Sequence, residues 1–155
     1  MSKNKGFSLT SAERYSLALY ELASENNVLS QVEDQSTSIL NLISSSKDFS
    51  NLIKDPTNNQ DDLLKVINDI SENNKFESLL KSFLSFLVTK RRFFYVEQIL
   101  KSFIETCSQK RGELKAELKS AKELSSDEIS KITSELIKNF SSKIKLNYKH
   151  DQSLI

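Results

Sequence analysis

Only two glycines, Gly6 and Gly112, and one proline, Pro56, interrupt the 155 residues of this chain. Such sparse punctuation favours helices and argues against an all-β fold. Apolar residues recur at helical spacing in six segments before Gly112. These segments cover about residues 9–26, 28–45, 47–54, 59–73, 76–90 and 93–110. Because the links between them are short, the sequence predicts an antiparallel bundle of six helices.

The hydrophobic period changes at Gly112. In residues 114–118 apolar and charged residues alternate, which is typical of a half-buried strand. Ser125 and Glu128 then form a capping-box pattern, which predicts the start of another helix. Residues 144–148 alternate again and predict a second strand.

The chain therefore divides into two predicted parts. We predict a mainly α protein, with an N-terminal six-helix bundle over residues 1–111 and a small, incomplete α/β segment (strand-helix-strand) over residues 112–155. Two strands and one helix bury too little apolar surface to stand alone as a domain. Since the last residues, Leu154 and Ile155, also resemble the start of a strand, we expect a C-terminal truncation.

Two of the predicted helices have apolar faces that are wider than one neighbour requires. In residues 11–25 the apolar arc covers about 200°, although about 100° is enough for burial against a single neighbour. In residues 76–90 serine and threonine leave only a narrow polar strip, so the apolar arc is equally wide. This surplus predicts either a central position in the bundle or a groove for a partner.

The sequence offers little material for catalysis. His150 is the only histidine, so neither a pair of histidine metal ligands nor a Ser-His-Asp triad finds support. Two glycines are too few for a phosphate-binding loop. The single Cys107 lies in line with apolar residues of its helix, as a packed thiol does. We expect no catalytic residue, cofactor or metal, and a role in binding or scaffolding.

Charge and hydropathy count against two further classes. The 22 basic and 21 acidic residues give a formal net charge of +1, and both parts are nearly balanced. A nucleic-acid binder is expected to carry an excess of basic charge. No apolar run approaches the roughly 20 residues that a membrane span needs. We therefore expect no nucleic-acid partner and no direct membrane insertion.

Short motifs along the chain resemble the delta subunit of F-type ATP synthases, which is called the oligomycin-sensitivity-conferring protein in mitochondria. The family's Arg-Tyr-Ala-x-Ala-Leu pattern matches residues 14–19, with Ser16 in place of the first alanine. Its proline after the third helix corresponds to Pro56. Its Asn-Gly-Arg pattern followed by an apolar residue corresponds to residues 90–93, where the arginine is kept and the glycine is lost. The signatures Ser-Ala-x-x-Leu-Ser and Asp-x-Ser-Leu-Ile appear at residues 120–125 and 151–155.

The resemblance implies a non-catalytic stator adaptor that links the catalytic head of a proton-translocating F-type ATP synthase to its peripheral stalk and supports ATP synthesis. It implies that the first and fifth helices hold the N-terminal helix of an alpha subunit, and that the C-terminal domain meets the stalk b subunits. It also implies a peripheral position on the cytoplasmic face of a bacterial inner membrane. The residues that we expect to bind the alpha-subunit helix are Tyr15, Ala18, Leu19, Leu22, Leu79, Phe83, Phe86 and Lys90.

Two alternatives stay open at this point. The groove residues would simply pack on one another if the bundle were closed there. The chain would instead be an all-helical RNA-binding or antitermination-type module if its basic residues contacted phosphates. The residues for that role are Lys90, Arg91, Arg92, Lys110 and Arg111.

Overall fold

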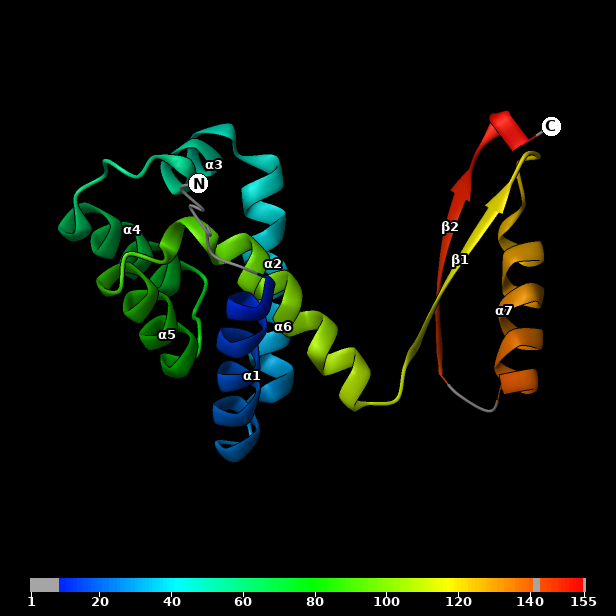
Figure 1. Ribbon diagram of the computed structural model, residues 1–155, viewed down its shortest axis with the longest axis horizontal. Helices are drawn as coiled ribbons and strands as arrows, with labels where there is room; N and C mark the ends of the chain where they lie inside the picture. Colours follow the sequence, from blue (N-terminus) through cyan, green and yellow to red (C-terminus); the bar gives the residue numbers. More distant parts are fainter. Residues whose placement is uncertain (1–8, 141–142, 155) are drawn as a thin grey trace, which may run out of the picture. The chain divides into compact units, whose positions relative to one another are not determined.

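The computed structural model describes residues 9–140 and 143–154, and these residues form a mainly α structure (Figure 1). The helices are α1 (Leu9–Glu25), α2 (Leu29–Ser45), α3 (Lys47–Lys54), α4 (Gln60–Asn73), α5 (Ser78–Thr89), α6 (Val96–Lys110) and α7 (Ser126–Phe140). The strands are β1 (Leu114–Ser120) and β2 (Ile144–His150), and the 3-10 turns are η1 (Phe93–Tyr95) and η2 (Gln152–Leu154). The chain divides into two compact units, and the boundary between them in the sequence lies between Cys107 and Ser108.

The first unit is a helical bundle with one apolar core. The six helices predicted before Gly112 are present, and α6 is preceded by the short turn η1. Each apolar stripe points inward: Leu19 of α1, Val32 of α2 and Phe103 of α6 are all fully buried. Cys107 is 1% exposed, so the thiol is packed in the core as its position on the apolar stripe predicts.

A pair of serines joins α1 to α6 inside this bundle. Ser16, which stands where the family motif has alanine, is fully buried. Its Oγ donates a hydrogen bond to the carbonyl oxygen of Glu13 (2.8 Å) and lies 3.0 Å from the Oγ of Ser102. The buried hydroxyl is therefore satisfied, and its burial carries no desolvation penalty of an unpaired polar group.

Four helices end in the same left-handed turn. Asn27, Lys75, Arg91 and Gly112 have φ angles of 57°, 52°, 56° and 72°. After α5 the backbone N–H of Arg91 donates to the Val88 carbonyl (3.0 Å), and the N–H of Arg92 donates to the Leu87 carbonyl (2.7 Å). This pair of bonds is the Schellman motif, in which glycine is the commonest left-handed residue. Arg91 thus adopts the conformation that glycine favours, at the position where the family pattern has its glycine.

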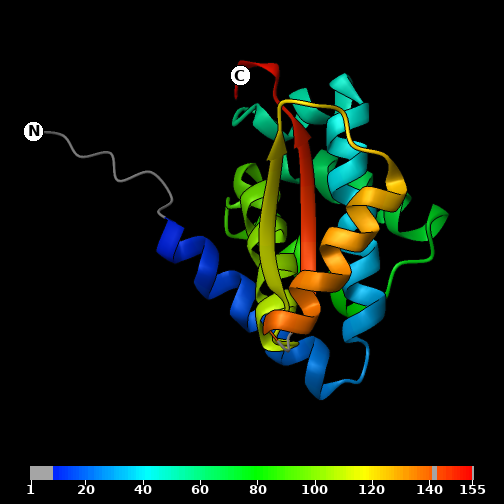
Figure 2. The ribbon, with the colours of Figure 1, turned by 90° about the vertical axis from the view of Figure 1, so that its right-hand side faces the viewer.

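The second unit is a parallel β-α-β arrangement. Strands β1 and β2 pair in register from Leu114 opposite Ile144 to Ser120 opposite His150. Helix α7 packs on one face of this two-stranded sheet (Figure 2). The half-buried side chains of β2 are Ile144, Leu146 and Tyr148, which alternate with exposed ones as the sequence predicts.

The start of α7 has the capping box that the sequence predicts. The backbone N–H of Ser125 donates to Oε2 of Glu128 (2.8 Å), and the N–H of Glu128 donates to Oγ of Ser125 (3.3 Å). The backbone bond from Ser125 is the main reason why the pKa of Glu128 lies below its ordinary value. Two of the N–H groups left free at the helix start thereby gain partners.

Replacement of this cap is expected to loosen α7. Ser125→Ala removes the hydroxyl acceptor and should lower the stability of the helix by about 1 kcal/mol. The carboxylate of Glu128 has a lower pKa in the folded than in the unfolded chain, so its contribution is complete above the unfolded value and is lost as the pH falls through the folded one. Amide hydrogen exchange in α7, followed by NMR at several pH values, should show both effects. Glu128→Gln should show less pH dependence, and equal protection of α7 in Ser125→Ala and the wild type would contradict the prediction.

Candidate functional site

Helices α1 and α5 contact each other, and an aromatic pair marks the contact. The rings of Tyr15 and Phe86 lie 6.4 Å apart between centroids, at an interplanar angle of 51°. The Nζ of Lys90 lies 5.8 Å from the centroid of the Phe86 ring, within the range of a cation–π interaction. Tyr15 is half-buried, whereas Phe86 is 45% exposed. The Tyr15–Phe86 pair therefore packs α1 against α5 and also leaves apolar ring surface exposed to solvent.

The structure separates the residues predicted to bind a partner into two layers. Ala18, Leu22, Phe86 and Lys90 are exposed, and Tyr15 and Leu79 are half-buried. Positions three, four and seven residues apart share a helix face, so these side chains form one apolar strip on each helix with Lys90 at the end of the second. We call Tyr15, Ala18, Leu22, Leu79, Phe86 and Lys90 together the α1–α5 surface.

Leu19 and Phe83 belong to the lower layer. Leu19 is fully buried and Phe83 is only 7% exposed, so neither offers area to a partner. Each lies on the side of its wide apolar arc that turns toward the bundle core, where it packs with the other buried side chains. We therefore correct their assignment: they support the α1–α5 surface from beneath and do not line it.

The exposure of the outer layer counts against the alternative that the groove residues only pack on one another within the core. Leu22 and Phe86 leave 46% and 45% of their surface exposed, although both are large apolar residues. Ala18, one turn before Leu22 on the same face of α1, is also exposed, and its side chain is small enough for the axis of another helix to approach closely, since interaxial distance depends on the residues at the contact. The bundle core thus covers only part of each wide apolar arc and leaves the rest exposed.

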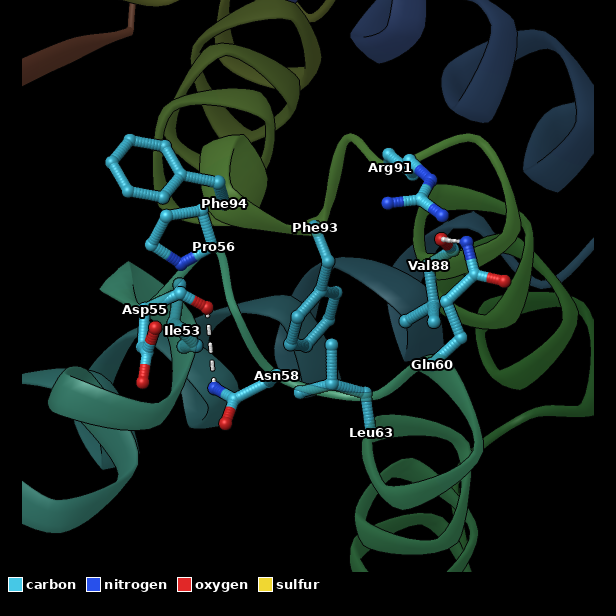
Figure 3. Close-up of a pocket in the computed structure, with 10 residues that line it drawn as sticks. All are labelled: Ile53, Asp55, Pro56, Asn58, Gln60, Leu63, Val88, Arg91, Phe93 and Phe94. Atoms are coloured by element: carbon cyan, nitrogen blue, oxygen red, sulfur yellow. Dashed lines mark hydrogen bonds between the residues drawn. The ribbon is translucent and has the colours of Figure 1, made fainter.

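A separate pocket of about 280 Å³ lies near the end of α5 (Figure 3). Its lining residues are Ile53, Asp55, Pro56, Asn58, Gln60, Leu63, Val88, Arg91, Phe93 and Phe94. The amide of Asn58 donates to the Leu52 carbonyl (2.7 Å), and the amide of Gln60 donates to the Val88 carbonyl (3.3 Å). The described lining holds no histidine, cysteine or serine, so it supplies no nucleophile with an adjacent imidazole base. Sequence periodicity does not detect this pocket, because residues from α3, the α3–α4 loop, α4, α5 and η1 form it.

Hydrogen bonds from its own loop stabilise the negative charge of Asp55 on the rim of this pocket. The N–H and the Oγ1 of Thr57 donate to one carboxylate oxygen of Asp55, at 2.9 and 2.6 Å. These bonds, the side-chain bond first, keep the pKa of Asp55 below its ordinary value. The pocket rim therefore carries a fixed negative charge at Asp55 and a positive charge at Arg91.

The other residues singled out in the sequence have structural surroundings. Arg111 donates to Glu113 (Nε to Oε1, 2.9 Å), and this bond is the main cause of the lowered pKa of Glu113. His150 is the last residue of β2, and its Nε2 lies 3.1 Å from the carbonyl oxygen of Ala121. Within residues 9–140 and 143–154, no three acidic, histidine or cysteine side chains gather as a metal site would require. None of the described helices has the length and hydropathy of a membrane span.

The order of the elements, a helical bundle followed by a β-α-β unit, is accompanied by a match to a known protein family. The family model described as "ATP synthase delta (OSCP) subunit" matches residues 12–155. The chain belongs to this family. It is 69% identical to the ATP synthase subunit delta of Pelagibacter ubique, over the whole chain and 84% of that relative. It is 31% identical to the corresponding subunit of Rhodospirillum rubrum, over the whole chain and 83% of that relative.

A solved structure has the same fold. One chain in the cryo-EM structure of the Toxoplasma gondii mitochondrial ATP synthase hexamer superposes with a TM-score of 0.78, over 92% of this chain and 79% of that one, at 21% identity. As a delta (OSCP) subunit, the protein is a non-catalytic stator component that links the head of ATP synthase to the peripheral stalk. The RNA-binding alternative is not favoured.

Proposed function

We propose that the α1–α5 surface is the docking site for the N-terminal helix of an alpha subunit of the catalytic head. The observation that carries this proposal is the exposed half of two wide apolar arcs, with Leu22 and Phe86 each close to half exposed. A helix that lays its apolar face along a groove between two others is a recurring mode of peptide recognition. A stator must resist the rotor, and a buried apolar contact of this kind supports the slow dissociation that the role demands.

The chemistry of the surface indicates what the partner helix should look like. Apolar side chains at i, i+3, i+4 and i+7 would cover Tyr15, Leu22 and Phe86. Lys90 ends the surface on α5, so an acidic residue near one end of the partner helix would gain a favourable charge contact. The Nζ of Lys90 lies 5.8 Å from the centroid of the Phe86 ring, so its charge stands beside the apolar surface that the partner helix would cover.

A peptide titration tests this assignment. The N-terminal segment of the alpha subunit from the same organism, as a synthetic peptide, should bind the 155-residue chain with one-to-one stoichiometry in calorimetry. NMR shift changes should then concentrate on α1 and α5. Failure to bind, or shift changes confined to the pocket lined by Pro56 and Phe93, would contradict the assignment.

We further propose that the second unit meets the b subunits of the peripheral stalk. In support, α7 contains no buried residue, and Ile137 is 42% exposed on it. Leu154, just after β2, is 53% exposed. Surfaces of this kind are available to a partner. In this arrangement the protein is held at the cytoplasmic face of a bacterial inner membrane by the complex.

We also propose that residues 1–111 form one domain, the helical bundle, and that residues 112–155 form a separate, partial α/β domain. Because α7 and its sheet bury little apolar surface, they should open more readily than the bundle. Hydrogen exchange followed by mass spectrometry is expected to show faster exchange in β1, α7 and β2 than in α5 and α6. Uniform protection across all five elements would indicate a single cooperative unit and contradict the division.

A further inference from the structure

The face of the sheet opposite α7 is rich in lysine. In residues 116–120 of β1 and 144–149 of β2, half-buried and exposed side chains alternate, and the half-buried ones lie on the α7 side. The described side chains on this second face are Glu117, Lys119, Lys145, Asn147 and Lys149, which we call the lysine face. The protein as a whole has a formal net charge of only +1, so this face concentrates positive charge that the rest of the chain balances.

The register of the strands places two lysines directly opposite each other, because Lys119 pairs with Lys149. Neighbouring strands lie about 4.8 Å apart, and like charges directly opposite are destabilising. The isolated unit therefore carries an electrostatic repulsion that contributes nothing to its own fold.

Acidic residues of the same unit compensate this repulsion only in part. Glu117 lies 3.9 Å from the Nζ of Lys119, and Glu113 lies 4.0 Å from the Nζ of Lys145. Both distances are at the outer limit of an ion pair, and Glu113 already accepts the closer bond from Arg111. Lys149 makes no ion pair with any residue of the described chain. A partner that supplies carboxylates would remove the remaining repulsion.

We propose that the lysine face docks an acidic segment of a peripheral-stalk subunit, an inference that rests on the proposed contact between the second unit and the stalk. Lys145 and Lys149 are about 13 Å apart along β2, at about 3.3 Å per residue. In an α-helix, two residues seven or eight positions apart share one face and lie about 10.5–12 Å apart along the axis. The long lysine side chains can span the small remaining difference, so the face fits a helix with an acidic residue at each end of about two turns.

The position of Glu117 favours a protein helix over a polyanion as the partner of the lysine face. It lies midway along the face, opposite Asn147, and would repel a continuous row of phosphates. A protein helix avoids that repulsion by placing lysine or arginine between its two acidic residues. The expected recognition pattern is therefore acid, base, acid at spacings of three or four residues, which are neighbouring positions on one helix face.

Charge reversal on the 155-residue chain tests the inference, with the soluble part of the stalk b subunits from the same organism as the probe. Lys145→Glu with Lys149→Glu should weaken b binding at least tenfold and reduce its dependence on salt, since fewer charge contacts remain. The matched control is Lys47→Glu with Lys54→Glu, which makes the same charge change at exposed positions of α3 in the first unit. Lys145→Gln with Lys149→Gln provides a milder version, and circular dichroism checks that each variant is folded.

The possible results separate the inference from the function on which it rests. Loss of b binding in the lysine-face variants alone, with unchanged binding of the alpha-subunit peptide, would support it. If b binding survived in those variants but fell in Ile137→Asp, the stalk contact would stand and the lysine face would be overturned as its location. If the wild type did not bind b at all, the proposed stalk contact would fail and the inference with it. Lysine-dependent binding of an RNA oligomer or of phosphatidylglycerol vesicles, without b binding, would also overturn it.

Discussion

Ala18→Asp is expected to leave the bundle folded and to weaken its affinity for the alpha-subunit helix at least 100-fold. Ala18 is exposed in the free protein, so the new carboxylate stays hydrated there and costs little stability. Under a docked apolar helix the same carboxylate would lose its water without gaining a partner, at a cost of several kcal/mol. Since 1.4 kcal/mol corresponds to a factor of ten, a 100-fold loss needs only about 2.8 kcal/mol.

Two measurements decide this prediction: a thermal melt followed by circular dichroism, and a calorimetric titration with the alpha-subunit peptide. Leu17→Asp is the matched control, because Leu17 is 43% exposed and lies on another side of α1. It introduces the same charge into the same helix and should leave peptide binding intact. A collapse of the fold in Ala18→Asp would show that position 18 is sealed in the native bundle, and undiminished peptide binding would place the partner elsewhere.

Leu19→Ala is expected to destabilise the bundle by about 2–5 kcal/mol, whereas Leu22→Ala should change its stability by less than about 1 kcal/mol. Both changes delete the same atoms from α1. Leu19 is fully buried, so its truncation leaves a cavity among close-packed neighbours, while Leu22 is 46% exposed and leaves little. Domains of this size are stable by only about 5–15 kcal/mol, so Leu19→Ala removes a large share.

Urea denaturation measures the difference in stability between the two variants. Titration with the alpha-subunit peptide measures the difference in their binding affinity. Leu22→Ala should weaken binding of the alpha-subunit helix, because it removes apolar area from the α1–α5 surface. Leu19→Ala, at temperatures where it is still folded, should retain most of that affinity. Equal destabilisation by the two substitutions would contradict the separation of the wide apolar arc into a buried and an exposed layer.

The number and kind of elements follow from local patterns. The scarcity of glycine and proline predicts the helices, and the stripe that includes Leu100 and Phe103 predicts the buried side of α6. Alternation in residues 114–118 predicts β1, and the Ser125–Glu128 pattern predicts the cap of α7. These features depend on residues a few positions apart, so they can be read without knowledge of the rest of the chain.

Boundaries depend partly on distant residues. The pattern places the start of the fifth helix at residue 76, but α5 begins at Ser78. The backbone N–H of Glu77 donates to Oε1 of Gln35 on α2 (2.8 Å), a bond between residues 42 positions apart. This bond gives a partner to an N–H that the helix itself cannot satisfy, and its acceptor on α2 is invisible to periodicity. The sixth helix also begins later than predicted, at Val96, after the 3-10 turn η1, in which the Tyr95 N–H donates to the nearby Arg92 carbonyl (3.0 Å).

The sequence by itself determined that α1 and α5 carry more apolar surface than one neighbour covers. Only the tertiary structure decided which part of that surface remains open: Leu19 and Phe83 are buried, while Ala18 and Phe86 are exposed. In the same way, the alternation of β1 and β2 indicates two faces, but only their parallel register places Lys119 opposite Lys149. The physical reason is the same in both cases. Periodicity assigns residues to a face of one element, whereas burial and charge pairing depend on which other element covers or adjoins that face.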